Sequence, residues 1–213
     1  MIRGRFIVFE GGEGCGKSTQ ARMLADWLRG QGEAAVLTRE PGGTPGAEAI
    51  RTLLLAPPAE GWGIRAEALL FAAARSDHVE RLIAPALAAG QWVVCDRYID
   101  SSRAYQGAAG GLDDAAILAL HEMGSGGLQP DVVYLLHAPP EEVSRRLAAR
   151  DGNARDAIGG RSAAFHQAVA EGFLALSARD PGRYRLIDGS APAEQVHRQI
   201  VAQLEKSPIA SDG

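Results

Sequence analysis

Cysteine is scarce in this chain of 213 residues, since Cys15 and Cys95 are the only two. Two cysteines are too few for a disulfide framework in a chain of this length, and a core of this size needs no cross-link. No apolar run approaches the ~20 residues of a membrane-spanning helix. The first five residues lead into a strand-like segment rather than a signal peptide. We therefore expect a soluble, cytoplasmic protein that does not associate with membranes.

An excess of positive charge is also missing. Lys and Arg total 22 against 26 Asp and Glu, which gives a formal net charge of −4. Such a chain has no bulk attraction for nucleic acid or for an anionic membrane, although a local basic cleft is compatible with this balance. Hydrophobic residues make up 46% and charged residues 23%, a globular composition that excludes wholesale disorder. The length predicts a single domain over residues 1–213.

Strands and helices alternate along the chain. Helical periodicity covers residues 17–30, about 66–89 with an interruption near Pro85, and 193–204, whereas 207–213 are predicted to form a frayed tail. Because the strands are uniformly apolar, we predict an α/β fold in which helices cover both faces of a parallel sheet. Right-handed crossovers bring the carboxyl ends of such strands to one edge, where ligands bind. Five apolar runs are predicted as strands: residues 6–9, 34–38, 92–95, 132–136 and 184–187.

A glycine-rich segment, residues 11–18, follows the first strand and matches the P-loop pattern G-x-x-x-x-G-K-[ST]. We predict that its backbone N–H groups surround nucleotide phosphates at the N-terminus of the next helix. Lys17 would neutralise the transferring phosphoryl group, and the Ser18 hydroxyl would bind Mg²⁺. The predicted ATP-binding residues are Gly11, Gly12, Glu13, Gly14, Cys15, Gly16, Lys17, Ser18 and Thr19.

Two large classes of P-loop protein are disfavoured by missing motifs. The chain has no Asn-Lys-x-Asp segment, by which GTPases read guanine, and no Ser-Gly-Gly-Gln segment of transporter ATPases. Small kinases remain as the main class. A nucleotide-dependent switch is a weaker alternative.

Four further segments carry motif-like sequences: residues 38–44, 71–75, 96–98 and 104–107. With the P-loop, they resemble the bacterial thymidylate kinase family over nearly the whole chain. The resemblance implies ATP-dependent phosphorylation of dTMP to dTDP, with Mg²⁺, on a three-layer P-loop kinase fold. It also implies a five-stranded parallel sheet, a small lid and a homodimer. Another nucleoside monophosphate kinase of the same fold is the closest alternative.

Four charged residues near strand ends have roles that their chemistry suggests. Arg39 follows the second strand, where its guanidinium fork suits phosphate oxygens. Asp96 follows the third strand and can hold Mg²⁺ through water, and the next residue, Arg97, can clamp a phosphate. Glu13 lies among phosphate-binding amides, where a carboxylate is costly unless it bonds to substrate or pairs with an arginine.

The remaining acceptor-side roles come from the resemblance. It implies that Phe71 stacks on thymine while Arg75, one helical turn away, reaches a base carbonyl. Without the resemblance, Phe71 would be read as a core aromatic residue. Tyr105 would crowd C2′ and so favour deoxyribose. The predicted dTMP-binding residues are Arg39, Phe71, Arg75 and Arg97, with Ser101, Ser102, Tyr105 and Gln106 on a loop after the third strand.

Arginines crowd a glycine-containing stretch that we predict to be a loop-like lid at about 145–162. A lid arginine could stabilise the charge of the transition state. Arg155 is the predicted one, with Arg150 and Arg161 as alternatives, because Ala157 stands where the family carries an arginine. His137 is a second departure from the family pattern. The predicted catalytic residues are Lys17, Arg97, Glu13 and Arg155.

Overall fold

A five-stranded sheet forms the centre of the computed structural model, which describes residues 4–151 and 159–206. All neighbouring strands run parallel, in the order β2-β3-β1-β4-β5. Val8 of the central strand lies opposite Cys95 on one side and Val133 on the other. The predicted parallel sheet is therefore confirmed. Its strands are β1 (Phe6–Glu10), β2 (Ala35–Arg39), β3 (Trp92–Asp96), β4 (Val132–His137) and β5 (Tyr184–Asp188).

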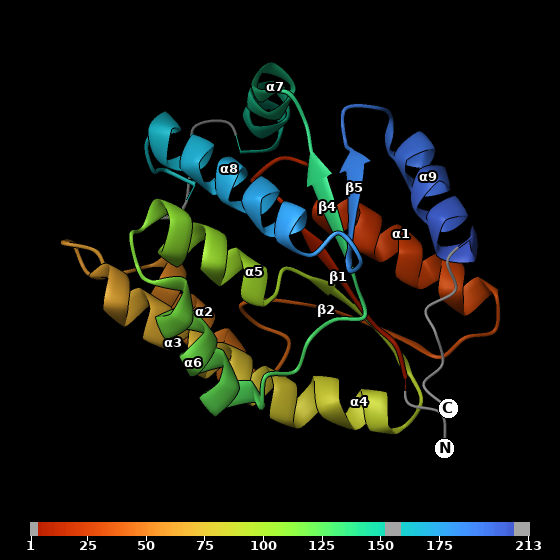
Figure 1. The fold of residues 1–213 in the computed structure, drawn as a ribbon, viewed down its shortest axis with the longest axis horizontal. Coiled ribbons are helices and arrows are strands. Elements are labelled where there is room, and N and C mark those ends of the chain that lie inside the picture. Colours follow the sequence, from red (N-terminus) through yellow and green to blue (C-terminus); the bar gives the residue numbers. More distant parts are fainter. Residues whose placement is uncertain (1–3, 152–158, 207–213) are drawn as a thin grey trace.

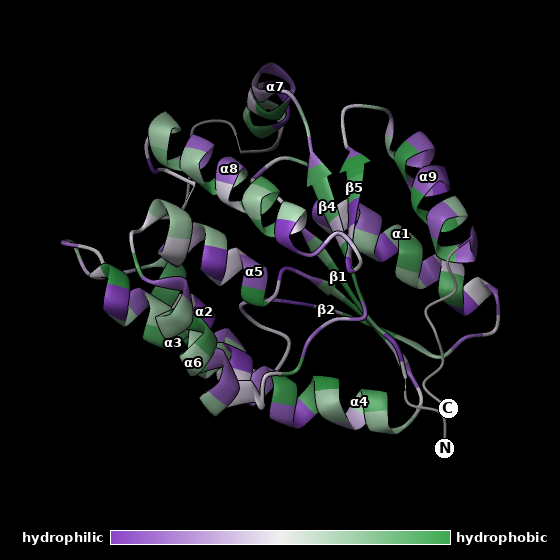
Figure 2. Cartoon of the chain, viewed as in Figure 1, coloured by the Kyte–Doolittle hydropathy of each residue, from purple (hydrophilic) through white to green (hydrophobic). Residues whose placement is uncertain are grey.

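Helices cover both faces of this sheet (Figure 1). Within β1, Phe6 and Val8 belong to one buried cluster, whereas Ile7 and Phe9 belong to the other. Figure 2 shows β4 as almost continuously hydrophobic, while α9 alternates hydrophobic and hydrophilic residues. This contrast is expected for a strand buried on both faces and a helix buried on one. The helix α8 (Ala163–Arg179) packs on the first cluster, and α1 (Lys17–Gly30) and α9 (Ala193–Lys206) pack on the second.

The helices α2 (Pro45–Leu55) and α6 (Asp114–Ser125) are two of those that lie outside the predicted ones. Each begins after a side chain that caps the first turn. Thr44 Oγ1 accepts a hydrogen bond from the N–H of Ala47, and Asp113 Oδ1 accepts one from Ala115, both at 3.3 Å. Such caps are a start signal that hydrophobic periodicity alone does not detect.

The long helical stretch before β3 contains a wide turn. α3 (Ile64–His78) passes into the π-helical turn η1 (Val79–Ile83) and then into α4 (Ala84–Ala88). Pro85 lacks an N–H, and its ring crowds the carbonyl group four residues earlier, which accounts for the widened backbone before it. The predicted irregularity is confirmed, and it begins one turn before the proline.

The segment after β3 is helical, not a loop. α5 (Ile99–Ser102) continues into the π-helical η2 (Arg103–Ala109). The carboxylate of Glu10 accepts the backbone N–H groups of Tyr98 at 2.8 Å and of Ser101 at 3.0 Å, and so caps this helix from another strand. A cap supplied from so far along the chain leaves no local sequence signal. The predicted loop is therefore wrong for Ser101, Ser102, Tyr105 and Gln106.

Helix also replaces the first part of the predicted lid. α7 (Pro140–Asp151) carries Arg145 and Arg146, so the loop prediction is wrong for these two residues. Arg155 and Ala157 lie outside the described residues, as does the predicted tail at 207–213. Among the helices of residues 4–151 and 159–206, none combines the length and apolar character needed to span a bilayer.

Candidate active site

The glycine-rich segment forms the turn between β1 and α1. Gly11, Gly14 and Gly16 have φ angles of 136°, 73° and 97°, which side-chain-bearing residues rarely adopt. A Cβ atom on Gly11 would also collide with the carbonyl oxygen of Leu136. The turn therefore exposes its backbone at the N-terminus of α1, an arrangement that binds phosphate.

Lys17, the first residue of α1, lies over this turn. Its Nζ donates a hydrogen bond to the Gly12 carbonyl at 2.6 Å, and the residue is only 6% exposed. Burial, followed by the positive charge of Arg97, lowers the pKa of Lys17 from 10.5. An anion bound in the turn would offset both effects and favour the charged amine.

A cleft of about 620 Å³ opens beside the turn at the carboxyl edge of the sheet. Of the predicted ATP-binding residues, it is lined by Glu13, Gly14, Gly16, Lys17, Ser18 and Thr19. Gly11, Gly12 and Cys15 are not among its lining residues. Of the predicted dTMP-binding residues, it is lined by Arg39, Phe71, Arg97, Ser101, Ser102, Tyr105 and Gln106. Donor-side and acceptor-side residues far apart in sequence thus share one cavity.

Arg97 stands where the two sides of the cleft meet. Its backbone has a φ of 71°, the one positive value among the described residues other than glycine. The guanidinium lies 2.5 Å from Glu13 Oε1 and 3.1 Å from both the Gly11 carbonyl and Ser101 Oγ. It also lies 5.2 Å from the ring centroid of Tyr105. Glu13 therefore has an arginine partner, one of the two arrangements expected for a carboxylate in this turn.

Asp96, at the end of β3, reaches the first turn of α1. Its Oδ2 accepts a short hydrogen bond from the Ser18 hydroxyl, while its buried Oδ1 has no hydrogen-bond partner among the described residues. The described residues contain no cluster of three or more His, Cys, Asp and Glu side chains that could hold a metal by themselves. A cation held by one carboxylate and one hydroxyl, with phosphate and water completing its shell, fits this donor set and matches the habits of Mg²⁺.

Phe71 and Arg75 share a face of α3 but differ in their access to the cleft. Phe71 lines the cavity, whereas Arg75 is not among its lining residues. The Arg75 guanidinium is buried, bonds to Glu40 Oε2 at 2.8 Å and donates to Ser102 Oγ at 3.0 Å. The direct contact of Arg75 with a base therefore stays a prediction, and its observed role is to hold Ser102 and Glu40.

Arg39 lines the cleft and pairs with a neighbouring carboxylate. Its NH2 group lies 2.9 Å from Glu48 Oε1, with half of the arginine side chain exposed. The backbone N–H of Gly43, and to a smaller extent Arg39, hold the pKa of Glu48 below its usual value. This pair holds the guanidinium beside the cleft, although an exposed pair of this kind is weak.

Arg146 is a cleft residue outside the predicted binding set. From α7 it lines the cavity, donates to Glu142 at 2.6 Å and donates to the Ser190 carbonyl at 3.3 Å. Arg145, its neighbour, is largely exposed. The sequence signal was the arginine-rich composition of the stretch, which does not indicate which side chain points inward.

A second cavity of about 250 Å³ adjoins the P-loop on the other side. It is lined by residues of several separate segments, including Gln20 of α1, Gly189 after β5 and Val196 of α9. The sequence analysis named none of these, because they match no motif and meet only when β5 and α9 pack against α1.

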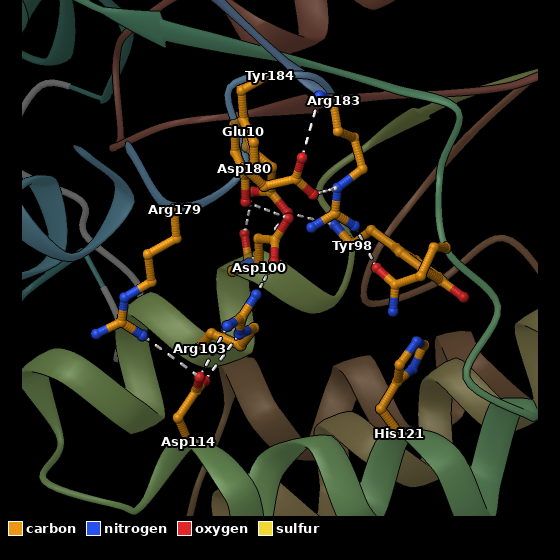
Figure 3. Close-up of polar contacts among 12 residues, drawn as sticks. Glu10, Tyr98, Asp100, Arg103, Asp114, His121, Arg179, Asp180, Arg183 and Tyr184 are labelled. Atoms are coloured by element: carbon orange, nitrogen blue, oxygen red, sulfur yellow. Dashed lines mark hydrogen bonds and ion pairs between the residues drawn. The ribbon is translucent and has the colours of Figure 1, made fainter. Parts of the chain in front are cut away.

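A network of polar contacts includes the buried carboxylates of Glu10 and Asp100 (Figure 3). Glu10 is fully buried and accepts the Ser101 hydroxyl at 2.6 Å, in addition to the two backbone N–H groups that it caps. Nearby, Asp100 accepts the Tyr184 hydroxyl at 2.6 Å and Arg103 at 3.1 Å. Burial, and then the charge of Asp100, raises the pKa of Glu10 from 4.5 to about 7. The sequence analysis missed Glu10, which reads as the end of an apolar strand.

This raised pKa predicts a pH dependence of stability. The folded protein binds the Glu10 proton more tightly than the unfolded chain does, so the free energy of unfolding should fall as pH rises from about 4.5 through about 7. Glu10→Gln cannot lose a proton there. Between pH 5 and pH 8, the wild type should lose on the order of 2–3 kcal/mol more than the variant in urea titrations. The exposed Glu60→Gln is the matched control, and parallel wild-type and Glu10→Gln curves would contradict the assignment.

Comparisons with known proteins agree on one family. The family model described as thymidylate kinase matches residues 9–200. The chain belongs to the thymidylate kinase family. The thymidylate kinases of Rhizorhabdus wittichii and Chromohalobacter salexigens are 52% and 49% identical to it, over 94% and 96% of this chain and 97% and 96% of theirs. The crystal structure of thymidylate kinase from Ehrlichia chaffeensis is 31% identical, with a TM-score of 0.75 over 95% of this chain and 99% of that one.

These findings confirm the resemblance and the predicted P-loop kinase fold. The thymidylate kinase match begins at Phe9, just before the P-loop, and ends at Ile200 in α9. It therefore spans both sides of the cleft. The roles of individual site residues stay predictions.

Proposed function

We propose that this chain transfers the γ-phosphoryl group of ATP to dTMP, giving ADP and dTDP, and that Mg²⁺ assists. The observation that carries the proposal is the single cleft in which the P-loop, Arg97 and Phe71 all take part. Two phosphate groups can therefore meet end to end between Lys17 and Arg97. The relatives cited above are all named thymidylate kinase.

The residues of the cleft would have separate roles in such a transfer. The P-loop turn and Lys17 would bind the donor phosphates, and Ser18 with Asp96 would hold the metal, which supplies charge neutralisation when bound. Arg97, fixed by Glu13 and Ser101, would hold the acceptor phosphate in line. A phosphate acceptor is already an anion, so positioning and charge stabilisation suffice without a general base.

Two further proposals concern the surroundings of the enzyme. We place it in the cytoplasm, in keeping with its substrates. We also propose a homodimer formed through α3 and α6, because these helices pack together and leave Leu69 and Met123 55% and 83% exposed.

The reaction is tested with purified protein, ATP and a panel of acceptors. We expect dTMP to give the highest kcat/KM among dTMP, dUMP, dCMP, dGMP and AMP, with no turnover after the divalent cation is chelated. A different best acceptor would favour another nucleoside monophosphate kinase. ATP hydrolysis that no monophosphate changes would favour a nucleotide switch, and either result would reject the proposal.

A further inference from the structure

Glu67 is a buried carboxylate with no role in the transfer described above. It lies on α3, is 5% exposed, and is absent from the residues that line the cleft. Its Oε1 accepts a hydrogen bond from Gln106 Nε2 at 2.7 Å. Its Oε2 accepts a short hydrogen bond from Arg161, whose guanidinium lies 4.6 Å from the ring centroid of Phe165. Both oxygens of Glu67 are therefore committed to donors.

The contact between Glu67 and Gln106 fixes which way the glutamine amide faces. A carboxylate paired with arginine only accepts hydrogen bonds, so the amide NH₂ group must point toward Glu67. The Gln106 carbonyl oxygen must then point the other way. This oxygen is buried and has no hydrogen-bond partner among the described residues, and Gln106 lines the cleft together with Phe71. Gln106, a residue of the cleft, thus carries a buried unsatisfied acceptor, and its contact with Glu67 determines that this atom is the oxygen.

We propose that Glu67 is a specificity-determining positioning residue, which makes Gln106 present an acceptor and thereby selects pyrimidines that carry an N3–H. This inference rests on the proposed function. Thymine and uracil have a donor at N3, whereas cytosine has an acceptor there. A cytosine ring would place two acceptors against each other in a buried site, with no water to separate them. The same arrangement does not discriminate thymine from uracil, which differ only in the 5-methyl group.

The test compares kcat/KM for dTMP, dUMP and dCMP in wild type and Glu67→Gln. The glutamine introduced at position 67 can donate to the Gln106 carbonyl, so the Gln106 amide is free to turn its NH₂ group toward the base. We expect the dTMP:dCMP ratio to fall at least ~10-fold, while the dTMP:dUMP ratio stays constant. Equal losses with all three acceptors, or an unchanged dTMP:dCMP ratio, would overturn the inference.

Two further variants separate orientation from a general structural role. Arg161→Gln removes the ion pair but keeps the Glu67 acceptor, so its dTMP:dCMP ratio should match wild type even if its turnover falls. In the double variant E67Q/Q106E, the amide at position 67 donates to the carboxylate at position 106, which then presents only acceptors to the base. This variant should therefore recover the wild-type dTMP:dCMP ratio. A dTMP:dCMP ratio that falls as far in Arg161→Gln as in Glu67→Gln would contradict the proposal. So would a ratio in the double variant that stays as low as in Glu67→Gln.

A further experiment uses the wild-type enzyme with a modified acceptor, so its result does not depend on whether a variant folds. The 5′-monophosphate of 3-methylthymidine lacks the N3–H, and wild-type kcat/KM for it should be at least ~10-fold below that for dTMP. Equal use of the two acceptors would overturn the inference about Glu67. Failure to phosphorylate dTMP itself would instead reject the proposed function, so the two outcomes are distinguishable.

Discussion

Lys17→Met is expected to lower kcat by about 10²–10³-fold or more, with little change in the KM for dTMP. Lys17 is the buried amine over the phosphate-binding turn, and burial already lowers its pKa. Its positive charge should therefore be most effective in the transition state, where negative charge develops on the leaving-group oxygen and is spread over the oxygens of the transferring group. Steady-state kinetics at saturating ATP, with dTMP varied, measure the effect.

The chain offers a matched control for this substitution. Lys206 is its only other lysine and is exposed at the end of α9. Lys206→Met makes the same chemical change on the surface and should leave kcat and KM as in wild type. A Lys17→Met enzyme within tenfold of the wild-type kcat would show that another cation neutralises the donor, and the cleft would then point to Arg146.

Arg97→Ala is expected to lower kcat/KM for dTMP by about 10³-fold or more, in the range found for arginines that stabilise phosphoryl transfer. The guanidinium is held by Glu13, Gly11 and Ser101, so its geometry is fixed before substrate binds. Arg97→Lys keeps the charge but not the planar fork, and should recover only a small part of the loss. Kinetics with dTMP varied at saturating ATP measure both variants.

Arg179→Ala is the comparison for this prediction. The Arg179 side chain is 70% exposed, and its contact with Asp114 is 3.8 Å long, so its removal should change activity and stability little. If Arg97→Ala keeps more than a tenth of the wild-type kcat/KM, the acceptor phosphate must be held elsewhere. Arg39 is the other predicted arginine on the acceptor side of the cleft.

The sequence predicted the site unevenly, and the structure shows why. The P-loop conformation depends on residues close together in the sequence, namely glycines at positive φ and the start of α1. A short sequence pattern was therefore enough to find it. Arg146 and Gln20 had no such pattern, since they reach their cavities only through the packing of separate helices. The prediction of a loop after β3 failed because the helix there is capped by Glu10, almost ninety residues earlier.

By itself, the sequence determined the five strands, their parallel arrangement and the edge of the sheet at which the P-loop lies, because hydrophobic period and glycine position act over a few residues. Only the tertiary structure decided which arginines enter the cleft, how Arg97 is held, and which end of the Gln106 amide faces Glu67. The contacts of Arg97 with Glu13 and of Gln106 with Glu67 are hydrogen bonds between residues of distant segments. Such bonds form only after the chain has folded, because burial removes the water that would otherwise satisfy both partners.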